Sequence, residues 1–411
     1  MACTTGLATS DQGGRSLRPV VRKGALTKGA TVFPSYPDLS RQVYRPAGRF
    51  VAWHLFNLMT FPLTRTIQRL IPLIAVLTTA AAVPEKALSG KRFDSSARAS
   101  KIDSQAKEHP EIGFTFGTDA KPQDLEHACV DTRVADQGKL VIWLMGHNQE
   151  LFEHVSGYGL HAIQVHYANG WFSKLYSGAP PADDLFLSKV RLEAATGEDH
   201  SPAVSIPKPD SIMERSYQFV KWLDRENPEG RWKQFLTDDG KGLRWDKVIL
   251  SGISHGSTTA ARMAKAVKVD RVVMFSGPRD QFEVWQKLPS ATPENRYFGF
   301  SHVLDDGWVG DHYCRSWQLL GLAKFGPIVN VDASKPPFGN SRRLTTEADV
   351  NRDAKRAHSG VVPGKGSPKA PAGAYLYEDV WRYVFTHPVD KTGDEVAPEA
   401  DCTINQRGES R

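Results

Sequence analysis

The sequence has little cysteine and no long apolar run, and both features limit what the chain can be. Four cysteines among 411 residues exclude a small disulfide-stabilised scaffold. No apolar run reaches the roughly 20 residues that a membrane-spanning helix needs. The sequence has no P-loop or G-x-G-x-x-G pattern, and beyond residue 82 no basic stretch interleaved with aromatic residues. It therefore gives no sign of a nucleic-acid partner.

The composition is that of a folded protein. Hydrophobic residues make up 40% of the chain, charged residues 24% and aromatic residues 10%, close to the average for soluble proteins, so most of the chain can bury a core. At roughly 100 to 200 residues per domain, the length allows two or three domains or one large α/β domain with insertions.

Positive charge is concentrated at the N-terminus. Residues 1–82 contain ten of the 52 lysines and arginines but only two of the 46 acidic residues. From Met59 the chain has two arginines, an apolar run over 70–77 and three alanines at 80–82, which is the order of a signal peptide cleaved near Val83. We therefore expect a secreted or periplasmic protein, with 1–58 disordered or an upstream extension, 59–82 the signal peptide, and no membrane span after its removal.

Periodicity predicts an α/β fold in the rest of the chain. Continuous apolar runs at 140–145, 247–250 and 271–275 are typical of parallel strands that are buried on both faces. A capping box, Ser211 to Glu214, predicts a helix over 212–226. We expect a mostly parallel sheet with helices on both faces and an insertion above the sheet.

The expected boundaries follow from composition. Residues 83–136 form an N-terminal segment with early antiparallel strands, for example at 112–116, and 137–388 form the catalytic domain. An acidic, aperiodic tail over 389–411 is expected to be flexible. Three cysteines, Cys129, Cys314 and Cys402, remain after the leader, so at most one disulfide and one free thiol can form. A bridge from Cys402 to Cys129 would tie the C-terminus down and is the pairing we expect if one forms, with three unpaired cysteines as the alternative.

The pentapeptide from Gly252 to Gly256 matches the pattern G-x-S-x-G. An apolar run precedes it and an alanine-rich stretch follows it, which predicts a strand, a tight turn and a helix. In such a nucleophile elbow, side chains two residues before and after the serine would clash with neighbouring backbone. The glycines Gly252 and Gly256 remove that clash. The pattern therefore predicts Ser254 as a nucleophile.

A serine nucleophile needs an acid and a histidine base, which follow it in that chain order in this architecture. Asp305, after a later expected strand, is the favoured acid, and Asp306 and Asp280 are the alternatives. The favoured base is His358, in a polar loop before the last expected helix, rather than His387 beyond that helix.

Two backbone N–H groups are expected to form an oxyanion hole for the reacting carbonyl oxygen. One belongs to His255, and the other to Gly146 or His147, in the loop after the first long strand. A glycine at 146 would permit the unusual backbone angles that aim an N–H inward. An insertion over 171–209 is expected to roof the site. Its apolar side chains either pack in a core or form a substrate-binding wall, with Trp171, Phe172 and Tyr176 as candidates.

These segments resemble the α/β-hydrolase superfamily, and more narrowly a group of secreted bacterial hydrolases whose substrate is not established. The narrower likeness covers about Lys139 to Phe385. Its segments include Gly157-Tyr158-Gly159-Leu160-His161, Phe275-Ser276-Gly277-Pro278-Arg279-Asp280, His302-Val303-Leu304-Asp305 and His358-Ser359-Gly360-Val361-Val362. The resemblance implies a catalytic triad of Ser254, Asp305 and His358. Such relatives often have Gln where this chain has His255.

The leading hypothesis is a secreted serine hydrolase that cleaves the ester of a small molecule or a polymer through an acyl-enzyme, with no cofactor and no metal. One alternative is a catalytically inactive, hydrolase-like binding protein, because a fold does not dictate function. Another is a metal-dependent hydrolase. Its ligands would come from His302, Asp305, Asp306, Asp311, His312 and His358. Their spacing is not that of a known tight ligand set, and Ser254 would be left unexplained.

The exported protein is predicted to begin near Val83, because basic, apolar and small residues succeed one another up to Ala82. N-terminal sequencing of the exported form measures this directly. A mature protein that begins upstream of Met59 would contradict the signal-peptide prediction.

Overall fold

The computed structural model describes residues 90–176, 182–280, 282–309, 312–399 and 402. The predicted extension over 1–58, the signal peptide over 59–82 and the cleavage site near Val83 lie outside these residues. None of the helices in the described ranges is both long enough and apolar enough to cross a membrane.

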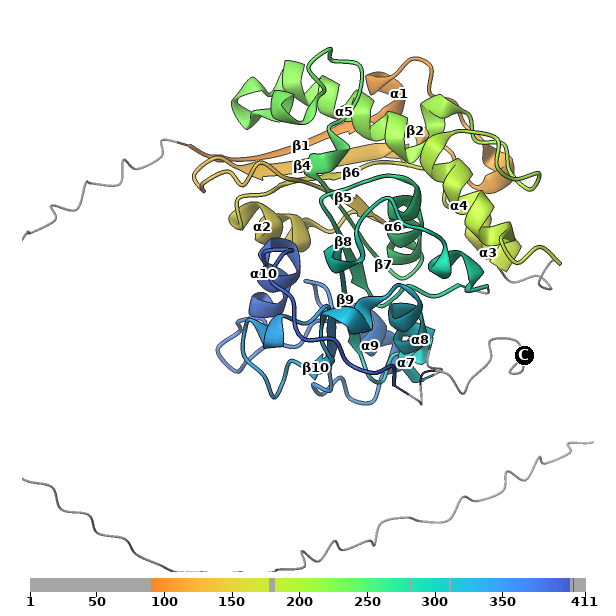
Figure 1. Cartoon of the computed structure of the whole chain (residues 1–411). Coiled ribbons are helices and arrows are strands. Elements are labelled where there is room, and N and C mark those ends of the chain that lie inside the picture. Colours follow the sequence, from red (N-terminus) through yellow and green to blue (C-terminus); the bar gives the residue numbers. More distant parts are fainter. Residues whose placement is uncertain (1–89, 177–181, 281, 310–311, 400–401, 403–411) are drawn as a thin grey trace, which may run out of the picture. The chain divides into compact units, whose positions relative to one another are not determined.

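A nine-stranded sheet forms the centre of the described part (Figure 1). Its first two strands are antiparallel, the third is antiparallel to the second, and all later neighbours are parallel. In spatial order the strands are β1 (Arg92–Arg98), β4 (Leu125–Asp131), β6 (His161–Gln164), β5 (Leu140–Leu144), β7 (Val248–Ile253), β8 (Arg271–Phe275), β9 (Tyr297–His302), β11 (Arg343–Thr346) and β10 (Ile328–Asn330).

Both faces of this sheet are apolar and covered by helices, as the uninterrupted apolar runs predicted. In β5, Leu140, Ile142 and Leu144 face one side, whereas Val141 and Trp143 face the other. The first side packs against α4 (Phe186–Thr196), α5 (Ile212–Glu226), α6 (His255–Ala266) and α8 (His312–Leu319). The second side packs against α2 (Gln149–Gly157) and α10 (Glu378–Thr386), which lie together in Figure 1. The predicted α/β-hydrolase fold is confirmed.

Local signals placed several elements correctly. Helix α5 spans the predicted residues, and its first turn is held by the Ser211 hydroxyl, which accepts a hydrogen bond from the Glu214 N–H at 3.2 Å.

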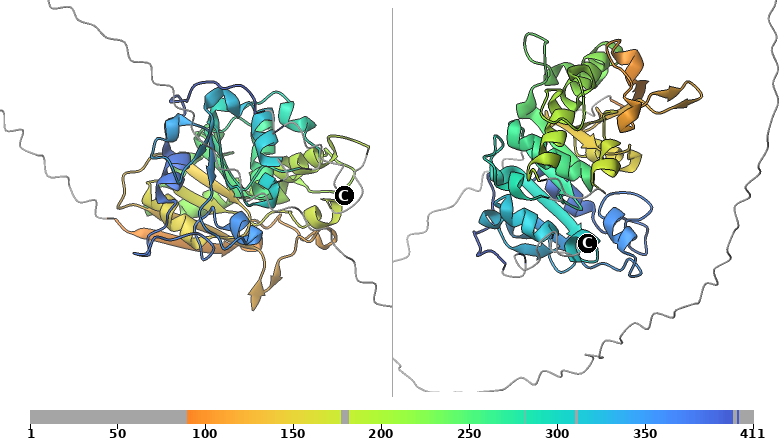
Figure 2. Two further views of the ribbon diagram at one scale, coloured as in Figure 1. Left: turned by 90° about the horizontal axis from the view of Figure 1, so that it is seen from below. Right: turned by 90° about the vertical axis from the view of Figure 1, so that its right-hand side faces the viewer.

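The described part also contains four shorter α-helices: α1 (Ala99–Ile102), α3 (Trp171–Tyr176), α7 (Asp306–Val309) and α9 (Ala354–Ser359). A small hairpin of β2 (Gly117–Thr118) and β3 (Lys121–Pro122) projects from the body in both views of Figure 2.

The N-terminal segment is not separate from the domain predicted over 137–388. Strands β1 and β4 join the same sheet as β5, so the expected boundary near residue 136 is not a structural division. The strand predicted at 112–116 is wrong, because a 3-10 turn covers Pro110–Ile112. Strand β4 was missed since its charged and polar residues, Glu126 and His127, hide the buried run from Ala128 to Val130.

The described part of the C-terminal tail is held against the domain, so the prediction of a flexible tail from residue 389 does not fit residues 389–399. The Arg343 guanidinium, buried in β11, forms an ion pair with Glu399 at 2.7 Å. The Val396 N–H donates to the Ala323 carbonyl at 3.0 Å. Buried charges are stable only when they are paired, so Glu399 fixes the path of the tail.

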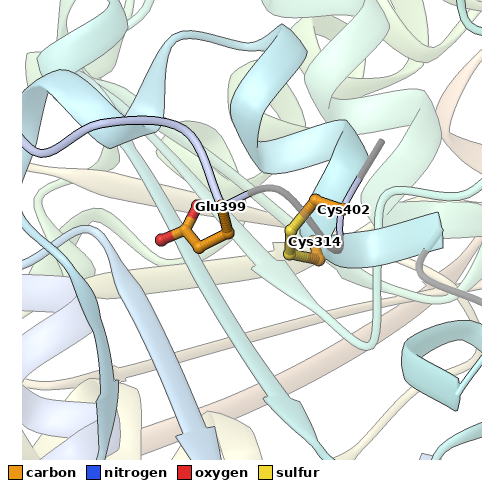
Figure 3. A group of neighbouring side chains, drawn as sticks. All are labelled: Cys314, Glu399 and Cys402. Atoms are coloured by element: carbon orange, nitrogen blue, oxygen red, sulfur yellow. A yellow bond between two sulfur atoms is a disulfide. The ribbon is translucent and has the colours of Figure 1, made fainter. Parts of the chain in front are cut away.

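A disulfide fastens the end of this tail (Figure 3). Cys402 is bonded to Cys314 of α8, with 5.5 Å between their Cα atoms, and Glu399 lies beside the pair. The predicted partner, Cys129, is a free and buried thiol whose Sγ donates to the Ser156 hydroxyl at 3.3 Å. The prediction was wrong because Cys129 faces α2, whereas α8 packs on the opposite face of the sheet.

Peptide mapping without reduction is predicted to recover Cys314 and Cys402 in one linked species. Cys129 is predicted to react with an alkylating reagent only after unfolding, because it is buried and burial raises the pKa of its thiol to about 12. A Cys129–Cys402 peptide, or alkylation of Cys129 in the folded protein, would contradict this arrangement.

Candidate active site

Ser254 lies on a strained turn between β7 and α6. Its φ of 57° and ψ of −122° fall in a region that residues with a Cβ rarely adopt. The turn is fastened on both sides: the Ser254 N–H donates to the Phe275 carbonyl at 3.1 Å, and the Ser254 carbonyl accepts from the Ser257 hydroxyl at 2.7 Å. The Ser254 side chain is partly exposed at the carboxyl edge of the sheet. This is the backbone geometry of a nucleophile elbow.

The two elbow glycines lie where backbone segments nearly touch. A Cβ at Gly256 would overlap the carbonyl oxygen of Leu144, at the end of β5. A Cβ at Gly252 would lie 2.5 Å from the Gly256 carbonyl carbon. Neither obstacle is a flexible side chain, so any other residue would push α6 away from β5 and relax the turn that holds Ser254.

The structure brings His358 and Asp305 together. The Nδ1 atom of His358 lies 2.7 Å from Oδ2 of Asp305, which is itself 1% exposed. His358 belongs to the short helix α9, capped by the Asp353 carboxylate, and not to a loop as predicted. Among the described residues, Nε2 of His358 has no hydrogen-bond partner, so this nitrogen is available to a hydroxyl or a substrate.

The carboxyl group of Asp305 is held as an anion by several donors. Besides His358, Oδ1 accepts the Gly307 N–H at 2.8 Å and the Tyr313 hydroxyl at 3.0 Å. Burial acts to raise the pKa of Asp305, but the hydrogen bonds and charge of His358, followed by the bonds from Gly307 and Ser276, hold it below its ordinary value. The sequence did not predict the role of Tyr313, because no motif around this residue indicates a hydrogen bond to Asp305, eight residues earlier.

Ser276 connects this pair to the elbow. It directly follows β8, the strand between those that carry Ser254 and Asp305, and its hydroxyl donates to the His358 carbonyl at 2.8 Å. The backbone N–H of Ser276 donates to the Phe300 carbonyl of β9 at 3.0 Å. Helix α9 is thus fixed over the carboxyl ends of adjacent strands, on the side that bears Ser254.

The alternative residues are occupied elsewhere. Asp306 begins α7 and is exposed. The fully buried Asp280 binds Arg191 with both oxygens, at 3.0 and 3.1 Å. His387 follows α10, where its Nε2 contacts the Lys391 carbonyl at 3.1 Å.

Arg191 is a functional-site neighbour that sequence reasoning missed. It comes from α4 in the insertion, is completely buried, and donates to Nδ1 of His255 at 2.8 Å and to the Thr259 hydroxyl at 2.9 Å. Because a guanidinium only donates, Nδ1 of His255 is an acceptor and the ring proton lies on Nε2. Burial, together with the charge of Arg191, lowers the pKa of His255 well below its ordinary value. The sequence signal for a buried arginine was its position between the apolar residues Val190 and Leu192.

The predicted oxyanion residues follow two adjacent strands of the sheet, β5 and β7. His255 is the first residue of α6, so its N–H has no acceptor within the helix. The parallel register of β5 and β7 runs up to the pair Leu144 and Gly252, so the segments that carry Gly146 and Ser254 leave the sheet from adjacent strands. The conformational reason given for a glycine at 146 is wrong: φ there is not positive, and a Cβ would meet nothing within 4 Å. His147 stacks on His127, with ring centroids 3.9 Å apart.

The predicted substrate wall is mainly a packing surface. Trp171 is 1% exposed and packs in the core of the insertion. Phe172 is partly buried, and its ring centroid lies 4.2 Å from that of His255. The side chain of Tyr176 lies outside the described residues. Trp171 and Phe172 therefore support the residue after Ser254 rather than enclose a large apolar pocket.

The residues of the metal hypothesis do not converge. Nε2 of His302 contacts the Ala348 carbonyl at 2.8 Å, and its Nδ1 accepts the Leu304 N–H at 3.0 Å, so both ring nitrogens are used within the protein. Asp311 and the side chain of His312 lie outside the described residues. Within the described ranges, the group of potential ligand atoms that lie close together is Cys314, Glu399 and Cys402, whose two sulfurs form the disulfide.

The fold and site define the class of the molecule: an α/β-hydrolase fold with a serine elbow and an adjacent Asp–His pair. No protein-family model and no curated protein matches the sequence. Among solved structures, the chain is similar to Thermogutta terrifontis esterase 2 phosphoramylated by tabun, with 11% identity, coverage of 67% of this chain and 88% of that one, and a TM-score of 0.30. It is also similar to a thermostable esterase from Pseudomonas putida ECU1011, with 11% identity, coverage of 75% and 85%, and a TM-score of 0.30.

Replacing Gly256 by alanine is predicted to lower the free energy of unfolding by roughly 3 kcal/mol or more, because backbone lies where the new Cβ must go. The matched variant Gly146→Ala is predicted to change it by no more than about 0.5 kcal/mol, since that position is open. Urea denaturation of both proteins gives the comparison. Equal effects would show that the close approach of β5 and α6 does not constrain the fold.

Proposed function

We propose that this protein is a serine hydrolase that cleaves carboxylic esters through an acyl-enzyme, with Ser254 as nucleophile, His358 as base and Asp305 as the acid that orients it. The observation that carries the proposal is the strained, partly exposed Ser254 at the same edge of the sheet as a hydrogen-bonded Asp305–His358 pair, in which Asp305 is buried and His358 is partly exposed. Polar contacts fix all three residues at the carboxyl ends of neighbouring strands.

In the first half of the reaction, Ser254 Oγ attacks the ester carbonyl carbon while His358 Nε2 takes the hydroxyl proton. Asp305 stabilises the resulting imidazolium through Nδ1. The oxyanion that forms accepts hydrogen bonds from the N–H of His255 and from the loop at Gly146 and His147. When the tetrahedral intermediate collapses, His358 returns the proton to the leaving alkoxide, and an alcohol departs.

In the second half, a water molecule takes the place of the alcohol. His358 removes a proton from it, the hydroxide oxygen bonds to the acyl carbon, and the bond to Ser254 Oγ breaks as the proton is returned to the serine. The products are a carboxylic acid and the free enzyme. This cycle uses the chain's own groups and needs no cofactor.

We also propose that the protein works outside the cytoplasm, in the periplasm or in the medium, in line with the resemblance to secreted bacterial hydrolases. The succession of basic, apolar and small residues up to Ala82 supports this. The disulfide between Cys314 and Cys402 also supports it, because disulfides persist in oxidising compartments.

A fluorophosphonate probe is predicted to label the wild-type protein and to leave Ser254→Ala unlabelled, because only an activated serine reacts with the probe. Ser359→Ala is the control: this serine is exposed on α9, and its removal should leave labelling unchanged. Intact-mass measurement gives the stoichiometry. Labelling that persists in Ser254→Ala would overturn the assignment of the nucleophile.

Asp305→Asn is predicted to lower kcat by about 10⁴-fold on an activated ester, since an amide favours the wrong tautomer of His358 and cannot stabilise its charged form. Asp306→Asn, at the exposed neighbouring position, is predicted to change kcat by less than about twofold, within the range of surface substitutions. Thermal melts establish that both variants are folded. Similar losses in the two variants would remove Asp305 from its role.

A further inference from the structure

A cavity of about 310 Å³ lies beside the proposed oxyanion loop. It opens at the carboxyl ends of β5 and β6, next to the base of the β2–β3 hairpin that projects in Figure 2. Its lining comprises Pro122, Gln123, Leu125, His127, Met145, Gly146, His147, Gln164, Val165, His166, Tyr167 and Asn169. A larger cavity of about 630 Å³ lies at the far end of α6, near Ala266 and Val267, away from Ser254.

The smaller cavity adjoins the elbow. Met145, which lines it, has its Cγ within 2.8 Å of where a Cβ on Gly256 would stand, in the first turn after Ser254. Gly146, also in the lining, follows Leu144 of β5 by two residues, and Leu144 pairs with Gly252 of the neighbouring strand β7, two residues before Ser254. If the carbonyl carbon of an ester lay at Ser254, either the acyl side or the alcohol side of the ester could therefore extend into this cavity.

The lining is polar but uncharged. It contains no lysine, arginine, aspartate or glutamate among the described residues. Burial lowers the pKa of His127 and of His166 to about 4 and also lowers that of His147, so the three imidazoles are neutral at pH 7. The cavity thus offers neutral donors and acceptors and no counter-ion for a charged group.

His127 presents the accessible polar edge of this surface. Its ring stacks on His147, with an interplanar angle of 10°, which fixes its orientation. Neither ring nitrogen of His127 has a partner among the described residues, and neither is sealed from solvent. Gln164 reinforces the surface, because its Nε2 donates to the Val165 carbonyl at 2.8 Å and is thereby held in place.

We propose that this cavity binds an uncharged, hydroxyl-rich group of the ester, of the kind a sugar ring or an open-chain sugar acid presents. The proposal rests on the proposed ester hydrolysis and names its substrate class. An alkyl group would desolvate the two ring nitrogens of His127 and leave them without partners on binding, which costs affinity. A carboxylate or phosphate would be desolvated without a compensating charge. Hydroxyl groups both donate and accept, and they match this lining.

Two matched pairs of esters test the proposal and tell apart the two ends of the substrate. Comparing kcat/KM for monoacetylated glucose and cyclohexyl acetate tests a hydroxyl-rich group on the alcohol side of the ester. Comparing methyl gluconate with methyl hexanoate tests the same group on the acyl side. In at least one pair, the hydroxylated ester is expected to have a kcat/KM at least about tenfold higher, the discrimination that one hydrogen bond provides.

The variant His127→Phe keeps a ring to stack on His147 and removes the two nitrogens. It is expected to lower the preference for the hydroxylated ester by about tenfold and to leave kcat/KM for the apolar ester unchanged or raised. His387→Phe, remote from the cavity, is the control and should change neither value. If His127→Phe does not fold, Asn169→Leu removes a polar group from the cavity's loop and serves the same purpose.

The outcomes separate this proposal from the proposed function. If Ser254 reacts with the fluorophosphonate but neither pair shows a preference, or the preference survives both cavity variants, the cavity does not bind a hydroxyl-rich group and the hydrolase proposal stands. If Ser254 does not react, both proposals fall. Normal labelling of a cavity variant that has lost its preference supports both.

Discussion

The close approach of α6 to the end of β5 is the contact on which the site depends. The Leu144 carbonyl occupies the space that a side chain at Gly256 would need, so the helix can begin only directly beside the strand. The chain must then turn sharply, and Ser254 takes the positive φ that this turn requires. The same contact keeps the first turn of α6, which begins at His255, close to the end of β5, which Gly146 follows. Strain at one residue is thus maintained by packing around it.

Buried charges fix the surroundings of that turn. Arg191 and Asp280 pair in the interior and hold His255, while Asp305 is held by His358, Gly307 and Tyr313. Breaking such a pair leaves one charge buried without a partner, at a cost of about 3 to 5 kcal/mol. These interactions tie the insertion and α9 to the carboxyl edge of the sheet. They explain why residues far apart in sequence keep fixed positions around Ser254.

The cavity proposed to bind the substrate lies elsewhere than the aromatic residues of the insertion suggested. Trp171 and Phe172 pack on His255 and Arg191, with the Arg191 guanidinium 5.4 and 5.6 Å from their ring centroids. The space beside the elbow lies instead between β4, β5 and β6, where neutral polar side chains gather. An aromatic cluster next to the proposed nucleophile therefore serves as a support, and our proposal for the substrate rests on the chemistry of the cavity instead.

The sequence by itself determined the features that depend on neighbouring residues. The capping box at Ser211 began α5, the apolar runs gave β5, β7 and β8, and G-x-S-x-G gave the elbow, because each rests on contacts within a few residues. The chain order of serine, acid and histidine singled out Asp305 and His358, which the fold brings to 2.7 Å. Strands β4 and β11, the partner of Cys402, the burial of Arg191 and the neutral cavity were decided by the tertiary structure. Each of these features depends on which face of the sheet a side chain lies on and on which side chains lie opposite it. A short stretch of sequence encodes neither of these two conditions.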